Sequence, residues 1–167
     1  TGHLCGWRAK KLRKGGNGMY THLIGQKSNK VKNTVERGLV KRFAESIGDP
    51  HPIYMDEETG LKSRYGGNIA PPTFPRVFDY GTIEQLKLPK KGLIHGEQKY
   101  HYIRPLLIGE ELYCWTEIKD YYEKVGSNGL MGFLVTKRAG EDKDGNLIFS
   151  EESAIIITET VRKAMSV

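Results

Sequence analysis

The sequence predicts an α+β fold in which one antiparallel sheet packs on a mostly apolar helix. Two observations lead to this class: two helical segments occupy the first half of the chain, and a run of alternating apolar and polar segments fills the second half. The length of 167 residues fits a single domain, which would bury about two-thirds of its unfolded surface.

The first helix is predicted from about Val35 to Ile47, because apolar residues recur there at helical spacing. Gly48 follows as a helix stop. The next stretch, GDPHPIYMDEETG, combines prolines with acidic residues. We expect it to form an irregular loop of the kind found at active sites, or a short one-turn helix.

A second helix is predicted within the stretch GGNIAPPTFPRVFDYGTIEQLK, which begins with prolines. Proline is tolerated in the first turn of a helix, because its missing N–H would be unbonded there in any case. In helical geometry Phe74, Val77, Phe78 and Gly81 share one face. The glycine on that face would let a sheet approach closely.

Four strands are predicted in the remainder, at about 97–104, 111–122, 129–138 and 147–158. Within the second of them apolar and polar side chains alternate, which is typical of a strand with one buried face. Asp144-Gly145-Asn146 is predicted to form the hairpin turn between the last two strands.

The net charge of the chain is +6, which by itself would suggest nucleic acid or an anionic membrane as a partner. Residues 1–18 contain five basic residues and no acidic residue, so 21 basic and 20 acidic residues remain in 19–167. The domain proper is therefore nearly neutral. We expect neither nucleic acid nor a membrane as its partner.

The basic segment 1–18 is interpreted as a leader that derives from the expression vector, ahead of a single domain at 19–167. It lacks the apolar stretch of a signal peptide and runs through glycines into Met19. The alternative is a native basic arm for RNA, DNA or lipid headgroups. The mass of the natively expressed protein distinguishes the two.

Cysteine and histidine usage predicts no disulfide framework and no metal site. The two cysteines, Cys5 and Cys114, favour a reducing, cytoplasmic location. The five histidines show no metal-ligand spacing, and the acidic turn at 142–146 lacks the glycine and the distal acid of a calcium loop. The chain has no glycine-rich phosphate loop either, so we expect no cofactor.

Candidate chemistry is confined to the segment from Ser46 to Tyr54. Asp49 could hold a water molecule there, and His51 or Tyr54 could move a proton. The alternative is that Asp49 only caps a turn by accepting backbone hydrogen bonds. The spacing alone favours capping.

Three stretches in order resemble the MaoC/(R)-hydratase superfamily, in its N-terminal FAS1-like dehydratase type: AESIGDPHPIYMDEETG, YGGNIAPPTF, and HGEQKYHYIRPLLIGEELYCWTEI from His95 to Ile118. The resemblance extends from Tyr20 to Glu159 and is strongest to small subunits of (3R)-hydroxyacyl-thioester dehydratases. It implies a hot-dog fold, a curved antiparallel sheet around one long helix, here expected at Thr73–Leu86. It also implies that two such units pair edge to edge.

The resemblance further implies that the catalytic loop is degenerate. Catalytic members carry approximately GDxNPxH, whose Asp and His activate water across the double bond of an enoyl thioester. Asp49 keeps the pattern, His51 stands at the Asn position, and Tyr54 stands at the His position. A phenol with an ordinary pKa near 10 is a poor general base at neutral pH.

A second departure concerns the thioester carbonyl. Catalytic members polarise it with a backbone N–H of a His-Gly pair, where this chain reads Ala70-Pro71-Pro72-Thr73. Proline has no N–H to donate. The Thr73 N–H is a possible substitute at a shifted position, and Pro72 and Thr73 are therefore candidate substrate contacts.

The favoured function is a subunit of an (R)-specific enoyl-CoA hydratase or 3-hydroxyacyl-thioester dehydratase, which binds the acyl chain beside a catalytic MaoC-like subunit. Phe74, Phe78 and Tyr80 are its candidate acyl-tunnel residues, although aromatics on a central helix are more often core. One alternative is a self-sufficient homodimer that uses Asp49 with His51 or Tyr54. Another is a non-enzymatic acyl-CoA-binding protein. The implied ligand is an acyl-CoA or acyl-carrier-protein thioester, whose phosphates would meet Lys62, Arg64, Arg76 or Arg104.

Overall fold

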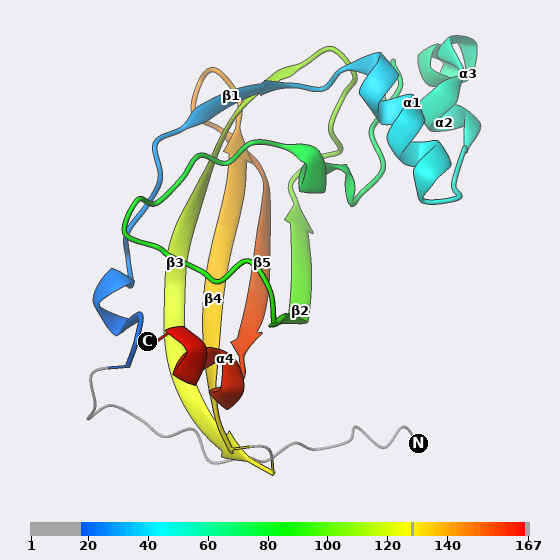
Figure 1. The fold of residues 1–167 in the computed structure, drawn as a ribbon. Coiled ribbons are helices and arrows are strands. Elements are labelled where there is room, and N and C mark those ends of the chain that lie inside the picture. Colours follow the sequence, from blue (N-terminus) through cyan, green and yellow to red (C-terminus); the bar gives the residue numbers. More distant parts are fainter. Residues whose placement is uncertain (1–17, 128, 166–167) are drawn as a thin grey trace, which may run out of the picture.

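The computed structural model describes residues 18–127 and 129–165, so the predicted leader lies outside the described residues except for Gly18. Five strands form one antiparallel sheet in the order β1-β3-β4-β5-β2. Their bounds are Val31–Thr34 (β1), Leu93–Tyr102 (β2), Glu111–Gly126 (β3), Gly129–Glu141 (β4) and Leu147–Ile157 (β5). Strands β3, β4 and β5 are long and curve together (Figure 1). This architecture confirms the α+β class.

All four predicted strands are present, and β1 is an addition. At four residues β1 is too short for its alternation to stand out in the sequence. The turn between β4 and β5 is also confirmed, because Asp142 Oδ1 accepts hydrogen bonds from the backbone nitrogens of Asp144 and Asn146, both at 2.9 Å. Gly145 has a φ of +83° there, a conformation that glycine adopts without steric cost.

The first predicted helix is confirmed as α1, Arg37–Ser46. The stretch after it contains two short helices, α2 at Pro52–Met55 and α3 at Glu57–Lys62. The one-turn-helix alternative was thus the right one for this stretch. In Figure 1 the three helices lie together beyond one end of the sheet.

The predicted central helix from Thr73 to Leu86 is wrong. The structure has one turn of 3-10 helix, η2 at Phe74–Val77, and residues 78–92 then contain no helix. This segment without helix crosses in front of the long strands before it joins β2 (Figure 1). The prolines therefore do not lead into a helix; the third of them, Pro75, already lies within the single turn.

Side chains of the N-terminal segment hold residues 79–81 in an extended path. The Asn33 side chain accepts a hydrogen bond from the Asp79 nitrogen at 2.9 Å and donates one to the Asp79 oxygen at 2.8 Å. The Ser28 hydroxyl donates to the Tyr80 carbonyl at 2.6 Å. Gly81 follows with a φ of +67°, outside the right-handed helical region. Backbone groups that a helix would pair internally are paired here by side chains instead.

The core consists of two apolar clusters. The first lies around η2 and includes Phe74, Phe78, Leu112 and Phe149. The second lies around η1 (Thr21–Leu23) and includes Leu23, Ile83, Ile118, Tyr121, Leu134 and Ile157. The C-terminal helix α4, Glu159–Met165, packs on the second through Val161 and Met165. None of the helices in the described part is long and apolar enough to cross a membrane.

Candidate functional site

The loop that carries Asp49 begins where α1 ends. Gly48 has a φ of +71°, and the Asp49 backbone nitrogen donates to the Ala44 carbonyl at 2.9 Å. This left-handed glycine turn is a common helix terminator and directs the chain away from the helix axis. The Asp49 side chain is exposed as a result.

His51 immediately precedes α2, Tyr54 lies within it, and the two residues are near each other. The His51 Nδ1 atom accepts a hydrogen bond from the Ile53 nitrogen at 3.1 Å and so caps the start of α2. Its ring centroid is 6.0 Å from that of Tyr54. Burial raises the pKa of the Tyr54 phenol, and the negative charge of Asp49 raises it further. The structure thus brings the three predicted residues together, with a phenol that stays protonated at neutral pH.

Asn68 holds this loop in place. It is 4% exposed, and its side-chain nitrogen donates to the carbonyls of Ile53 at 2.8 Å and Asp56 at 2.7 Å. Its side-chain oxygen accepts a hydrogen bond from Arg37 on α1 at 2.9 Å. One buried amide therefore connects both ends of α2 to α1. Sequence reasoning did not identify Asn68.

The prolines of 70–73 lie in a turn before η2. The Phe74 nitrogen donates to the Pro71 carbonyl at 2.9 Å, and the Tyr102 hydroxyl donates to the Pro72 carbonyl at 2.6 Å. Thr73 is exposed, and none of the described residues accepts a hydrogen bond from its backbone N–H. That N–H is thus free to bind a ligand oxygen.

The three predicted tunnel aromatics lie in the first core cluster. Phe74, Phe78 and Tyr80 are 0%, 8% and 5% exposed. The rings of Phe74 and Phe78 meet edge to face, 5.4 Å apart. The Tyr80 hydroxyl donates to the Pro75 carbonyl at 2.7 Å. Phe74 therefore serves as packing in this chain, and none of the three lines the pocket described next.

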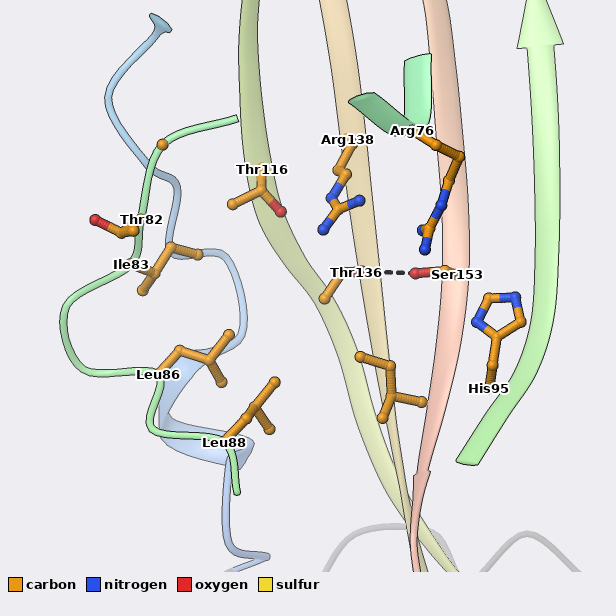
Figure 2. Close-up of a pocket in the computed structure, with 12 residues that line it drawn as sticks. Arg76, Thr82, Ile83, Leu86, Leu88, His95, Thr116, Thr136, Arg138 and Ser153 are labelled. Carbon is orange, nitrogen blue, oxygen red and sulfur yellow. Dashed lines mark hydrogen bonds between the residues drawn. The ribbon is translucent and has the colours of Figure 1, made fainter. Parts of the chain in front are cut away.

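A pocket of about 340 Å³ lies between the strands and the segment 78–92. In Figure 2, Ile83, Leu86 and Leu88 extend from that segment toward the strands. Arg76 enters from η2 and Arg138 from β4, and both point toward the hydrogen bond between Thr136 and Ser153. Part of its lining, from Arg76 to Leu86, comes from the stretch that was predicted to form the central helix.

A polar band crosses the sheet at the floor of the pocket. One row of cross-strand neighbours is Thr116, Arg138, Glu151 and Tyr100, and the next row on the same face contains Thr136 and Ser153. The rows on either side belong to the two apolar clusters, with Phe149 on one side and Leu134 on the other. The band therefore separates the two halves of the core.

The charged side chains of the polar band meet at Glu151. This carboxylate is 1% exposed, and its Oε1 atom accepts a hydrogen bond from Arg138 at 3.3 Å. Arg76 lies 3.8 Å from the same oxygen. The guanidinium of Arg138 also stacks over the Tyr80 ring at 4.9 Å. Burial raises the pKa of Tyr100 to about 12, and the charge of Glu151 adds to that rise.

The other predicted phosphate contacts do not converge. Arg104 makes two hydrogen bonds to Glu110, and Lys62 pairs with Glu58 along α3. Arg64 lies over the ring of Tyr65. Of the four basic residues only Arg76 lines the pocket.

The sequence prediction did not include Arg138 and Glu151, although the sequence carries a signal for both. Each stands at an inward position of a strand whose other inward residues are mainly apolar or small.

Comparison with solved structures identifies the fold class as hot-dog. The C-terminally truncated HadBC (3R-hydroxyacyl-ACP dehydratase) complex of Mycobacterium tuberculosis matches with a TM-score of 0.70 at 21% identity, over 81% of this chain and 97% of that chain. The (R)-hydratase of A. caviae involved in PHA biosynthesis matches with a TM-score of 0.55 at 19% identity, over 79% and 94%. At these identities the likeness shows the fold, which confirms the expected hot-dog class.

The chain belongs to the FAS1-like dehydratase domain family. The family described as "FAS1-like, dehydratase domain region" matches residues 22–151. Among curated relatives, a UPF0336 protein of Thermobifida fusca is 34% identical over 102 residues, or 58% of this chain and 67% of that protein. A UPF0336 protein of Clavibacter michiganensis is 30% identical over 129 residues, or 74% and 84%.

Proposed function

We propose that this chain is the substrate-binding subunit of an (R)-specific enoyl-thioester hydratase or 3-hydroxyacyl-thioester dehydratase. A second hot-dog chain with an intact catalytic loop supplies the proton-transferring groups. The observation that carries the proposal is the combination of a family-typical loop with a tyrosine, Tyr54, in place of a base. Its raised pKa makes the phenol a hydrogen-bond donor and not a proton acceptor at neutral pH.

The segment before η2 also supports the proposal that this chain binds the substrate while a second chain performs the catalysis. Addition of water to an enoyl thioester places negative charge on the thioester oxygen, and loss of one donor to such an oxygen typically costs about 100-fold or more in rate. Pro71 and Pro72 have no N–H. The Thr73 N–H is available, but it is a single donor on an exposed turn. Efficient catalysis therefore needs the carbonyl site of another chain.

The sheet has an edge that suits pairing with a partner. Strand β2 is the last strand in the sheet order and pairs only with β5 among the described strands. Its outer edge can accept a strand from a second hot-dog unit. Two solved structures of the same fold are complexes by name, HadBC and the ChsH1-ChsH2 complex of Mycobacterium tuberculosis, the latter with a TM-score of 0.63 at 20% identity over 78% of this chain and 82% of that chain.

The pocket offers the acyl group a place in this subunit. Its apolar wall, formed by Ile83, Leu86 and Leu88, faces the strands. Asp49 and His51 stay at the loop, where they can contact the thioester end of the substrate. In this proposal the chain positions the substrate and the partner performs the proton transfers.

Activity measurements on the chain alone and in a complex test the proposal. We expect no hydration of crotonyl-CoA or longer enoyl-CoA by the isolated chain, and turnover when a catalytic MaoC-like subunit is co-expressed. Asp49→Asn tests the self-sufficient alternative. If the isolated chain is active and Asp49→Asn abolishes that activity, the subunit proposal is wrong.

A further inference from the structure

The guanidinium groups at the pocket floor have more hydrogen-bond donors than the protein satisfies. An arginine carries five N–H donors. Arg138 gives one hydrogen bond to Glu151, and in the described part of the chain both its Nε atom and the Glu151 Oε2 atom are buried without a partner. Arg76 lies 3.8 Å from the same Glu151 oxygen, which is beyond hydrogen-bond distance. The two guanidiniums at the floor together therefore carry more donors than the single carboxylate beside them can accept.

The same groups carry a surplus of positive charge. Two guanidiniums share one carboxylate, and Glu151 is the only acidic residue within ion-pair distance of either among the described residues. Glu151 is 1% exposed, whereas the side chains of Arg76 and Arg138 are 49% and 33% exposed, so the carboxylate is buried and both guanidiniums remain accessible. The remaining polar lining consists of His95 and hydroxyl groups, and two of these hydroxyls, on Thr136 and Ser153, bond each other at 3.0 Å. A group with negative charge and several acceptor atoms would complement this floor.

The opposite wall of the pocket is apolar and suits the aliphatic part of a ligand. Ile83, Leu86 and Leu88 line it, and Ile155 extends the apolar surface onto β5. A volume of about 340 Å³ has room for roughly ten groups of water or methylene size, at about 30 Å³ each. The pocket thus has room for an aliphatic chain of several carbons with a charged end.

We infer that the pocket binds an aliphatic carboxylate, with the carboxylate between Arg76 and Arg138 and the chain along Ile83, Leu86 and Leu88. Arginine is suited to this role because its planar fork matches a carboxylate. A free medium-chain fatty acid has this chemistry. So does an acyl thioester whose far end is carboxylated, and only this second source rests on the proposed function.

Titration of the full chain with octanoate and with 1-octanol, followed by calorimetry, tests the inference. We expect saturable octanoate binding and at least tenfold weaker binding of the alcohol. Arg76→Gln should weaken octanoate binding at least tenfold and leave octanol unchanged, whereas Arg42→Gln, on the exposed face of α1, should change neither. Equal affinities for acid and alcohol, or an Arg76→Gln variant that binds octanoate as well as wild type, would overturn the inference.

Glu151→Gln provides the opposite test. The native carboxylate competes with the ligand for the two arginines, so its neutral isostere should bind octanoate at least threefold more tightly. Circular dichroism establishes that the variant is folded, and the Arg76→Gln titration decides the matter if it is not. Weaker octanoate binding by folded Glu151→Gln would show that the guanidiniums do not hold the carboxylate.

Thioesters distinguish the two sources. If a carboxylated acyl thioester is the ligand, suberyl-CoA should bind at least tenfold more tightly than octanoyl-CoA. If the free acid is the ligand, octanoate binds while the two thioesters do not differ. The inference is overturned if octanoate binds no better than 1-octanol and suberyl-CoA binds no better than octanoyl-CoA. Absence of turnover with every partner would instead remove the proposed function and leave the octanoate result standing.

Discussion

Gly60 on α3 lies so close to Asn68 that a Cβ at position 60 would be 2.6 Å from both the backbone and the side-chain nitrogen of Asn68. Asn68 is the residue that ties the candidate loop to α1. The missing side chain at Gly60 is therefore what admits the amide that positions Tyr54 and its neighbours.

Gly60→Ala should destabilise the protein by about 1–3 kcal/mol, because backbone and a buried amide must move to admit the methyl group. The matched control is Gly38→Ala on α1, where the nearest atom to a new Cβ is the flexible end of Arg42 at 3.4 Å. That change should stabilise by about 0.5–1 kcal/mol. Urea denaturation measures both. Equal stabilisation by the two variants would contradict the packing described.

Asn68→Asp keeps the shape of the side chain and removes both donors to the carbonyls of Ile53 and Asp56. Both carbonyls are only partly buried, so we expect a total loss of about 1–3 kcal/mol. Asn146→Asp removes a donor in the exposed β4–β5 turn and should cost less than about 1 kcal/mol. Urea denaturation compares the two. Similar losses of stability in the two variants would show that the hydrogen bonds of Asn68 do not stabilise the loop.

Stability should fall above pH 9 because of Cys114. Burial raises the pKa of its thiol to about 12 from an ordinary 9. A raised folded-state pKa favours the protonated thiol, so this contribution is complete below pH 9 and is lost as pH rises toward 12, at about 1.4 kcal/mol per pH unit. The Cys114→Ala variant has no thiol and therefore lacks this pH-dependent contribution to stability. Urea denaturation between pH 8 and 10 should show the two curves converging; parallel curves would contradict the assignment.

The Arg138–Glu151 pair should behave non-additively. Arg138→Gln leaves a buried carboxylate whose remaining ion-pair partner among the described residues, Arg76, is 3.8 Å away, which should cost about 3 kcal/mol. The double variant with Glu151→Gln removes both charges, and its loss should be smaller than the sum of the single losses. Thermal or urea unfolding of the four proteins gives the coupling energy. A value near zero would mean that the pair is not coupled.

Tyr54→His restores the residue type found in catalytic loops. We expect weak enoyl-CoA hydration that rises with pH around 6.5, as the imidazole loses its proton. The rate should remain about 100-fold or more below that of an intact hot-dog hydratase, because the prolines at 71–72 still lack donors. The double variant with Asp49→Asn is the control. Hydration that is absent at every pH would show that Tyr54 does not occupy the base position.

Local sequence patterns predicted the elements whose contacts are local or repeat along the chain. The alternation in β3 to β5, the periodicity of α1 and the Asp142 to Asn146 turn each have a signal within a few residues, and each is present. The second helix had such a signal as well, in the apolar spacing of 74–81. It failed because Ser28 and Asn33, about fifty residues earlier, bond to the backbone at Asp79 and Tyr80.

The sequence by itself therefore determined the α+β class, the family resemblance and the grouping of Asp49, His51 and Tyr54, since these depend on spacing along one short segment or on order along the chain. Only the tertiary structure decided that the segment 78–92 is extended and that a pocket lies beneath it. It also brought Arg76 and Arg138 to the one carboxylate of Glu151. Those contacts join η2, β4 and β5, and side chains from separate elements meet only when the sheet has set their register.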